Sequence, residues 1–566
     1  MKMKKFKIFL NVYLTILISI SWCAAEDIVL KCDEYNTNIG GMEKFCTVSG
    51  FQVTHSQNVK IPPYVKANQT NFMKFYNSVL LDIPAKLFDV FSSLKTLDVS
   101  NTEIEDISRN TFTSASTLTT LNLSHNHIEK INTSVFVGAH NLMRLDLSYN
   151  KLHTLGSLAF RGLTNMNKVI LSNNLLSVIP EDLFFENTYM DAVYLDNNQL
   201  EFIKPEVFYH LRHIRDLNLS NNRLKSFDPQ TFQHSYGPEV LLLARNQLEE
   251  FSLCNKTITK KLDLDSNRLT SLAVNGTNFL SAINNSISDV KVFNGQSVNV
   301  LLLRSNNLTD IRNITLLTHL TELDLSFNPV GTPNISTFQN QERLTILNLK
   351  ATGIKKLTFG MFAKLVMLDN LDLSYNNLSD LNLDIFVPAN ANIRSFFMDA
   401  NNLTEIQGKY TFAKAFPQLI ELGISLNRFN CSYLHWLLIK PQLTDYTILH
   451  IEHDDSAKET THIRDVTCIS HVQDELQQAE HDLESSKNFQ QILKTSMDTM
   501  AVHAQQMQKY LLVMSITLTC FIVVLCTVCL ITAVQYWRTQ RAKYFQRRGG
   551  AIVFHSNATV NTHVEQ

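Results

Sequence analysis

The chain has 566 residues, which is long enough for several compact domains or for one extended repeat array. Its 50 Lys and Arg residues nearly balance 52 Asp and Glu residues, so the composition lacks the excess positive charge typical of nucleic-acid binding. With 16 Gly and 12 Pro residues, the composition also differs from that of an extended disordered protein.

Residues 1–25 are typical of a secretory signal peptide. A basic start runs to Lys7, an apolar stretch follows from Phe9 to Trp22, and small residues end at Ala25. The pattern predicts cleavage before Glu26. An N-terminal membrane anchor is the alternative, and cleavage fits better because an apolar segment of spanning length occurs later in the chain.

Residues 26–66 are expected to form an N-terminal cap, and residues 67–429 repeat one unit, LxxLxLxxNxL, mostly every 24 residues. We count about sixteen units, including a worn one at Met73 and Phe75 and a degenerate one at Asn285. Such periodicity predicts an α/β solenoid, a leucine-rich repeat horseshoe with disulfide caps at its ends. Position nine of the unit falls on Thr102, Asn126, Asn150, Asn174, Asn198, Asn222, Asn246, Asn267, Asn306, Asn328, Thr352, Asn376, Asn401 and Asn427.

The invariant positions have structural explanations. Leucines at positions one, four, six and eleven should stack on their counterparts in adjacent coils. Asn at position nine both donates and accepts hydrogen bonds, so it can satisfy backbone groups where the buried chain turns. A second ladder should fill the convex side of the core: Phe88, Phe112, Phe136, Phe160, Phe184, Phe208, Phe232, Phe338, Phe362 and Phe386.

Positions three, five, seven and eight are expected to face outward and to form one concave sheet. Most of them are polar, but an apolar subset suggests a protein contact. The alternative is that loops or neighbouring side chains cover this subset. It comprises Ile170, Tyr194, Leu242 and Leu302 at position five, Val240 and Val300 at position three, and Tyr149, Phe327 and Tyr375 at position eight.

The period breaks once, where 39 residues separate Asn267 from Asn306. This distance corresponds to two shortened units, and the segment has no clear Phe. We expect a change of curvature or a protruding loop there.

Five cysteines lie between the signal peptide and the later apolar segment. Cys32 and Cys46 precede the first unit, and we expect them to pair in the N-terminal cap. Cys431 and Cys468 are expected to pair in a C-terminal cap over residues 430–468. Cys254 is left as the odd cysteine. It either forms an intermolecular disulfide, remains a free thiol, or is buried as a small hydrophobic residue.

The C-terminal cap contains an apolar run that should close the repeat core. Its expected members are Leu434, Trp436 and Leu437.

The density of Asn-x-Ser/Thr sequons fits a secreted or lumenal chain. The candidate glycosylation sites are Asn68, Asn122, Asn132, Asn218, Asn255, Asn275, Asn284, Asn307, Asn313, Asn334, Asn377, Asn402 and Asn430.

Residues 469–509 show apolar residues at alternating spacings of three and four, which predicts a dimerising coiled coil. A lone helix is the alternative because the seam includes Ser486 and Gln490. An uncharged segment follows, and residues 510–536 are expected to form a transmembrane helix. The basic residues after it place the tail, residues 537–566, in the cytoplasm and predict a single-pass type I plasma-membrane protein with extracellular repeats.

The sequence contains none of the common catalytic motifs, so no enzyme activity and no cofactor are expected. His450, Glu452 and His453 offer metal-ligand chemistry, but a polar loop of the C-terminal cap explains them better.

The combination of signal, repeats, terminal cysteine cap and coiled coil resembles the insect leucine-rich repeat immune proteins best known from mosquitoes. The stretches "NRFNCSYLHWLLI" and "HIRDVTCIS" are most similar to that family's junction between cap and coil. The apolar span resembles its transmembrane subfamily. The resemblance implies innate immune recognition of protein ligands such as complement-like thioester proteins, and homo- or heterodimers formed through the coil. A leucine-rich repeat adhesion receptor of neural or tissue development is the alternative.

Overall fold

The computed structural model describes residues 28–37, 44–53, 59–60, 67–84, 86–253, 257, 259–387, 391–439, 448–450, 461–463 and 466–468. The predicted signal peptide, coiled coil, transmembrane helix and tail lie outside these residues, as do Cys254 and Asn255. Among the residues that are described, no helix combines the length and the apolar character needed to cross a bilayer.

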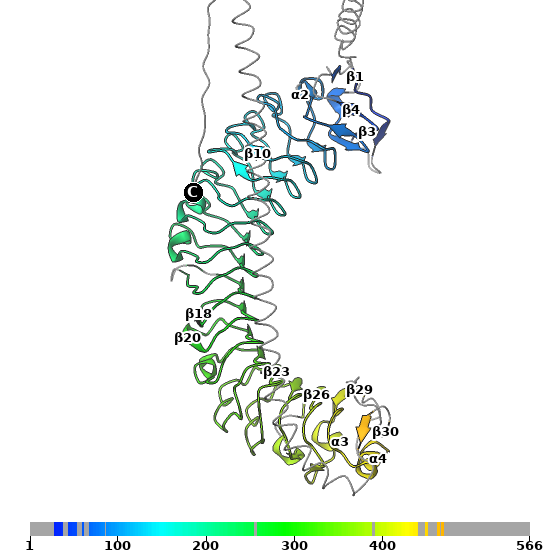
Figure 1. The fold of residues 1–566 in the computed structure, drawn as a ribbon, viewed down its shortest axis with the longest axis vertical. Helices are drawn as coiled ribbons and strands as arrows, with labels where there is room; N and C mark the ends of the chain where they lie inside the picture. Colours follow the sequence, from blue (N-terminus) through cyan, green and yellow to red (C-terminus); the bar gives the residue numbers. More distant parts are fainter. Residues whose placement is uncertain are drawn as a thin grey trace, which may run out of the picture. The chain divides into compact units, whose positions relative to one another are not determined.

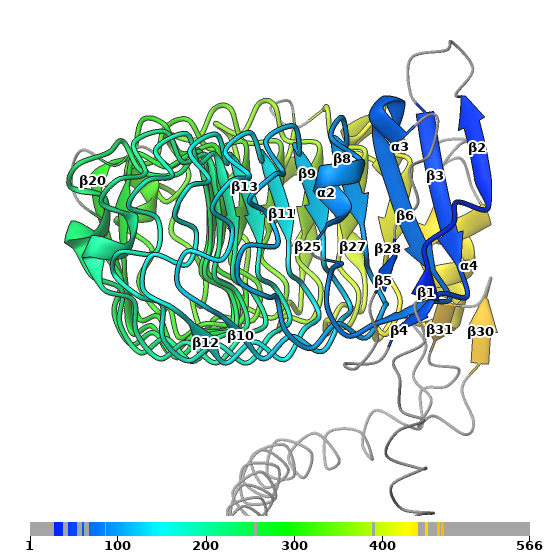
Figure 2. The same ribbon diagram turned by 90° about the horizontal axis from the view of Figure 1, so that it is seen from above.

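One long sheet lines the inner, concave side of the curved repeat array (Figure 1). Each repeat contributes a short strand formed by positions three to five, and neighbouring strands pair in parallel and in register. Among the described strands of this sheet, β2 and β3 at the N-terminal edge form the one antiparallel pair. Figure 2 shows the N-terminal strands side by side.

In spatial order the sheet contains β2 (Glu34–Thr37), β3 (Lys44–Ser49), β6 (Phe72–Tyr76), β8 (Thr96–Asp98), β9 (Thr120–Asn122), β11 (Arg144–Asp146), β13 (Lys168–Ile170), β14 (Ala192–Tyr194), β15 (Asp216–Asn218), β16 (Val240–Leu242), β17 (Lys261–Asp263), β19 (Phe279–Ser281), β21 (Val300–Leu302), β22 (Glu322–Asp324), β23 (Ile346–Asn348), β24 (Asn370–Asp372), β26 (Ser395–Phe397), β28 (Glu421–Gly423) and β29 (Ile448–His450).

The rest of each coil consists of turns and very short elements. A coil of about 24 residues leaves room for little more than one helical turn between strands, so the α part of the predicted α/β solenoid is reduced to single turns. The helical turns are η1 (Ala67–Gln69), α2 (Leu87–Val90), η2 (Pro205–Phe208), η3 (Pro229–Phe232), η4 (Ile314–Leu316), η5 (Leu383–Ile385) and α3 (Phe412–Ala415). Short parallel pairs join β1 (Ile28–Val29) to β5 (Val59–Lys60), β4 (Gln52–Val53) to β7 (Val79–Leu80), β10 (Lys130–Ile131) to β12 (Thr154–Leu155), and β25 (Leu381–Asn382) to β27 (Ile406–Gln407).

The leucine and phenylalanine ladders form one continuous core, as predicted. The Phe side chains at 24-residue spacing are at most 2% exposed. Their rings follow one another from Phe88 to Phe232 with centroids 5.3 to 6.2 Å apart. Each coil therefore depends on its two neighbours to bury its apolar side chains.

The position-nine asparagines connect adjacent coils by hydrogen bonds, and Asn174 is representative. Its Nδ2 donates to the carbonyl of Leu147 in the preceding coil at 2.9 Å and to that of Leu171 in its own coil at 3.0 Å. Its Oδ1 accepts from the N–H of Leu152 at 3.0 Å. The same bonds recur along the array as far as Asn427, so this Asn satisfies backbone groups of two coils at once.

Thr replaces Asn at positions 102 and 352 because the preceding turn is satisfied differently there. The backbone carbonyl of Thr102 accepts from Leu80 N–H at 2.7 Å, and Val330 N–H, the equivalent donor before Thr352, donates to the Asn328 carbonyl at 2.9 Å. The side-chain acceptor that Asn supplies elsewhere is therefore not needed by the preceding coil.

Asn174→Ala is expected to lower the free energy of unfolding by about 3 kcal/mol, because the buried N–H of Leu152 and the carbonyl of Leu147 lose their partner. Urea unfolding followed by circular dichroism measures the loss. Asn167→Ala is the matched control, since Asn167 is exposed and should change stability by less than about 0.5 kcal/mol. Equal losses in the two variants would contradict the structural role of position nine.

Both ends of the core are closed by a disulfide cap. Cys32 is bonded to Cys46, and Cys431 is bonded to Cys468. In the C-terminal cap, α4 (Cys431–Ile439) lies over the last coil, β29 extends the main sheet, and β30 (Thr461–Ile463) pairs antiparallel with β31 (Val466–Cys468).

The expected set of cap residues was partly wrong. Leu434 and Leu437 are buried, but Trp436 is 40% exposed and Leu438 is buried instead. The Trp436 ring contacts Tyr433 with centroids 5.7 Å apart. Consecutive residues of a helix point about 100° apart, so Leu437 and Leu438 can share the buried face while Trp436 turns outward.

The segment between Asn267 and Asn306 forms two short coils that are linked through Asn285, whose Nδ2 donates to Leu264 and Ala282 carbonyls. Of the two expected alternatives, a change of curvature or a protruding loop, the loop is not found in this segment, all of whose residues are described. Instead, β18 (Ser271–Asn275) and β20 (Asp289–Asn294) pair in parallel outside the concave sheet.

Candidate ligand-binding surface

Position five forms a continuous row along the concave sheet. Ile170 on β13 and Tyr194 on β14 are direct neighbours in this row. Asn218 on β15 separates Tyr194 from Leu242, and two further strands separate Leu242 from Leu302. All four predicted apolar residues are half-buried. The structure therefore places Ile170 and Tyr194 side by side, whereas Leu242 and Leu302 lie farther along the row.

Tyr194 lies in a charged environment. The ammonium of Lys168 in the preceding coil is 4.6 Å from the centre of its ring. Burial raises the pKa of the Tyr194 hydroxyl, and Asp216, Asp191 and Asp196 raise it further by charge repulsion with the phenolate. The ring is thus an apolar surface bordered by ions.

Position three contributes more apolar residues than the sequence interpretation included. Val240 and Val300 are half-buried as expected of outward strand positions. Phe279 and Ile346 occupy the same position on β19 and β23, and Phe397 occupies position five on β26. Strict use of the repeat numbering would have found all three.

Position eight has an unusual backbone. In every coil from Asn101 to Leu426 this residue has φ between 51° and 58°, the left-handed region. Asn tolerates this conformation best among non-glycine residues, and it occupies the position in several coils. Tyr149, Phe327 and Tyr375 are bulky exceptions and are 52%, 41% and 43% exposed.

Each of these three aromatic rings contacts a side chain from the preceding coil. Tyr149 stacks on His125 with centroids 4.3 Å apart and ring planes within 7°. The Arg304 guanidinium lies 5.0 Å from the ring of Phe327, and the Lys350 ammonium lies 4.5 Å from the ring of Tyr375. These contacts fix the orientation of the rings without burying them.

Position seven faces outward in only some coils: Arg304 is exposed and Lys350 is half-buried, whereas serines at this position are buried in other coils. Ser148, Ser172 and Ser374 are buried there, each at most 7% exposed. The chain begins its turn at this position, so a small side chain fits beneath the surface. The N–H of Ser148 donates to Asp146 Oδ1 at 2.9 Å, which ties position seven to position five.

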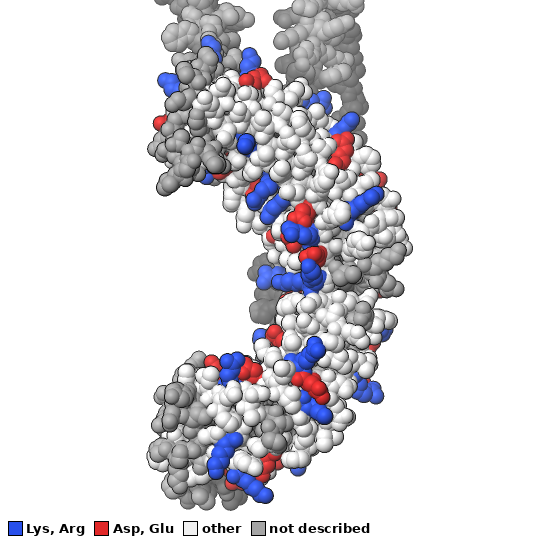
Figure 3. Space-filling model, turned by 180° about the vertical axis from the view of Figure 1, so that it is seen from behind, with Lys and Arg blue, Asp and Glu red and all other residues white. Residues whose placement is uncertain are grey.

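Charges of both signs alternate along the array (Figure 3). Several pair across adjacent coils, such as Arg215 with Asp191 at 2.6 Å and Lys260 with Glu239 at 2.8 Å. Such exposed pairs add little stability. Because neither sign dominates, the surface favours a partner with mixed polar and apolar groups over a uniformly charged polymer.

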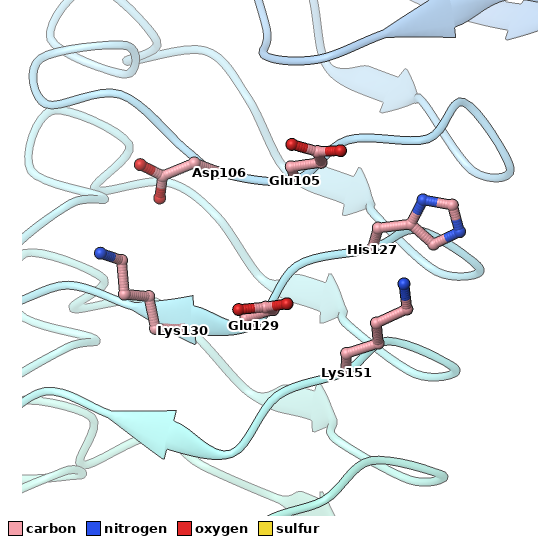
Figure 4. Close-up of a pocket in the computed structure, with 6 residues that line it drawn as sticks. All are labelled: Glu105, Asp106, His127, Glu129, Lys130 and Lys151. Atoms are coloured by element: carbon pink, nitrogen blue, oxygen red, sulfur yellow. The ribbon is translucent and has the colours of Figure 1, made fainter. Parts of the chain in front are cut away.

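A shallow hollow of about 320 Å³ lies among the N-terminal coils (Figure 4). Its lining side chains come from three successive coils and are all exposed. They are Glu105, Asp106, His127, Glu129, Lys130 and Lys151. Solvent screens these charges, and they surround no buried nucleophile, so the hollow is an open ionic surface.

Within the described ranges, no group of three His, Cys, Asp or Glu side chains is arranged to hold a metal ion. Glu452 and His453 lie outside those ranges.

The sequons occupy different faces of the coils. Asn122 and Asn218 lie on the concave strands β9 and β15. Asn307, Asn377 and Asn402 occupy position ten, just after the buried Asn. The remaining described sequons lie in turns or on the short outer elements: Asn68, Asn132, Asn275, Asn284, Asn313, Asn334 and Asn430.

Family models support the repeat assignment. A model described as leucine rich repeat matches residues 76–128 and 318–378, and one described as BspA type leucine rich repeat region matches residues 105–239. No curated protein matches the sequence.

Solved leucine-rich repeat structures resemble the array. The APL1 leucine-rich repeat domain is 21% identical, with 79% of this chain and 100% of that chain covered and a TM-score of 0.51. A chain of the LRIM1/APL1C complex is 20% identical over 85% of this chain and 79% of that chain, with a TM-score of 0.51. A chain of the Drosophila Toll–Spatzle complex is 20% identical, with 71% of this chain and 60% of that chain covered and a TM-score of 0.53. At these identities the similarity establishes the leucine-rich repeat fold.

Proposed function

We propose that this protein is a single-pass cell-surface receptor or co-receptor that binds a protein ligand on its concave face, acts in insect innate immunity, and has no catalytic activity. Two solved relatives by fold are complexes, LRIM1/APL1C and Toll–Spatzle, which supports a protein-binding role. The proposed ligand class is a complement-like thioester protein. Residues 469–509 would form the homo- or heterodimer.

The observation that carries the proposal is the set of aromatic residues at position eight. A bulky side chain in the left-handed region costs about 1–2 kcal/mol, and Asn at the same position in other coils avoids most of that cost. Tyr149, Phe327 and Tyr375 remain about half exposed, so their burial contributes only part of its possible free energy to the stability of the fold. Strained, exposed aromatic side chains are suited to binding, where buried aromatic groups contribute most.

The apolar residues of positions three and five extend this surface. Leu302 lies on β21, and Phe327 follows β22, so the two residues come from adjacent coils. Ile346 and Phe397 continue the apolar surface toward Tyr375. Because the repeat core fixes the shape of this surface, a ligand binds with little loss of conformational freedom.

The topology is tested on intact cells that express the full chain with an epitope tag after Gln566. External protease should remove the repeats and leave the tag, because the basic residues after the apolar segment 510–536 favour the cytoplasm. A tag that is cleaved from outside would contradict the single-pass orientation. Repeats that resist protease until the cells are permeabilised would contradict the surface location.

A further inference from the structure

Asn218 is a sequon residue in the middle of the concave position-five row. It begins the sequence Asn-Leu-Ser and lies on β15, between Tyr194 on β14 and Leu242 on β16. Adjacent strands in a sheet are roughly 4.8 Å apart, so both apolar side chains lie within reach of a sugar attached to Asn218. Asn122, the other sequon residue on the concave strands, has the charged residues Asp98 and Asp146 as its strand neighbours instead of apolar ones.

The two polar atoms of the Asn218 amide differ in their hydrogen bonding. Its Oδ1 accepts a hydrogen bond from the N–H of Ser220 at 3.1 Å. Asp146 and Asp372 make the same strand-end bond in their coils, to Ser148 at 2.9 Å and Ser374 at 2.8 Å. Within the part of the chain that the structure describes, the Nδ2 of Asn218 makes no hydrogen bond. Substitution at Nδ2 therefore leaves the strand-end bond intact. At Asn313, by contrast, one Nδ2 hydrogen is already donated to the Val290 carbonyl.

We propose that Asn218 carries an N-linked glycan whose first sugar packs on Tyr194 and Leu242. The inference rests on the secretory route included in the proposed function. The donor is an oligosaccharide linked through pyrophosphate to a polyisoprenol. The Asn218 Nδ2 forms a bond to C1 of the first sugar, the bond from C1 to the pyrophosphate oxygen breaks, and the amide loses one proton to a base. The products are the glycosyl amide and the polyisoprenyl pyrophosphate.

The surroundings of Tyr194 fit a sugar. Lys168 contacts the ring from the preceding coil, whereas Asn218 lies on the following coil. The C–H groups of a pyranose ring form an apolar face that packs on aromatic side chains, and the half-buried Leu242 extends this platform on the other side of Asn218.

The glycan explains why part of the position-five row is apolar without requiring a protein partner there. The chain's own carbohydrate covers Tyr194 and Leu242, and it also restricts the approach of a protein ligand to Ile170. Leu302, Phe327 and Tyr375 lie several strands away and stay open. The protein ligand therefore contacts residues outside the glycan-covered pair, among them Tyr149, Phe327 and Tyr375.

The test uses the full chain from a eukaryotic secretory host. Mass spectrometry of glycopeptides measures occupancy at Asn218, Asn122 and the exposed Asn377. N-glycosidase then releases the sugars under native conditions, and the rate is followed at each site. We expect an occupied Asn218 that is released several-fold more slowly than Asn122. The double variant Tyr194→Ala/Leu242→Ala should raise the rate at Asn218 to that at Asn122, while an unchanged rate at Asn122 shows that the fold persists.

Three outcomes would overturn the proposal. If Asn377 carries sugar and Asn218 does not, the proposed glycan at Asn218 is refuted, but the proposed function is not. If no sequon carries sugar, the secretory route fails and the proposed function fails with it. If Asn218 is occupied but its release rate is the same in wild type and in the double variant, the sugar does not pack on Tyr194 and Leu242.

Discussion

Phe184→Ala is expected to lower the free energy of unfolding by about 3–5 kcal/mol. Phe184 is 1% exposed and lies between the rings of Phe160 and Phe208, with centroids 5.9 and 6.2 Å away. Truncation leaves a cavity in the convex half of the core. The neighbouring coils cannot move to fill it because the packing of their own Leu and Phe side chains fixes their positions. Urea unfolding monitored by circular dichroism measures the loss.

Phe185→Ala is the matched control in the adjacent residue. Phe185 is 54% exposed, and its ring meets the His210 ring edge to face with centroids 4.8 Å apart. Its truncation should change stability by less than about 1 kcal/mol. A loss at Phe185 as large as that at Phe184 would mean that the phenylalanine ladder is not the convex half of the core.

The parts of the fold that the sequence predicted well are those that repeat. Leu121, Leu123 and Asn126 recur at a fixed offset, and a solenoid core requires that offset since each coil stacks on an equivalent one. The inward leucines, the Phe ladder and the turn asparagines followed from this requirement alone. The concave position of Tyr194 followed too, because it depends only on the strand alternation within one coil.

The features that the sequence did not predict depend on contacts between coils or on backbone geometry. The burial of Ser148 reflects a turn that begins one residue earlier than the repeat pattern suggests, and the exposure of Trp436 reflects how α4 is rotated on the last coil. The left-handed backbone at position eight cannot be predicted from the residue type of Tyr149. It becomes visible only when Asn is seen to occupy the same position in other coils.

The candidate surface likewise has features that the sequence predicted and features that only the structure shows. The sequence identified Leu302 and Phe327 as outward-facing but not the cation from the preceding coil that contacts the Phe327 ring. In the sequence alone, Asn218 is one sequon among many. Only the strand register shows that Asn218 lies between Tyr194 and Leu242.

Replacing Tyr149, Phe327 and Tyr375 together by Asn is expected to weaken binding of the protein ligand at least roughly tenfold, which corresponds to about 1.4 kcal/mol. Buried aromatic anchors commonly contribute about 2 kcal/mol or more each. Stability should rise or stay within about 1 kcal/mol of wild type, because Asn tolerates the left-handed backbone of position eight. Binding therefore falls without a matching loss of stability, which a loss of folding cannot produce.

The matched control replaces three aromatic residues outside the concave sheet by Asn. Tyr236, Phe293 and Phe359 are 76%, 73% and 71% exposed, which exceeds the exposure of the concave aromatics. If general surface apolarity drove binding, this control would weaken it at least as much as the concave variant does.

The most direct test is the equilibrium dissociation constant of the partner isolated with the wild-type ectodomain, residues 26–468, measured side by side on wild type and both triple variants. The concave-face proposal predicts a loss of at least roughly tenfold for the position-eight variant, at unchanged or higher thermal stability, and no change for the control. Equal affinity of the position-eight variant and wild type would contradict the proposal and place the ligand contact outside the concave face.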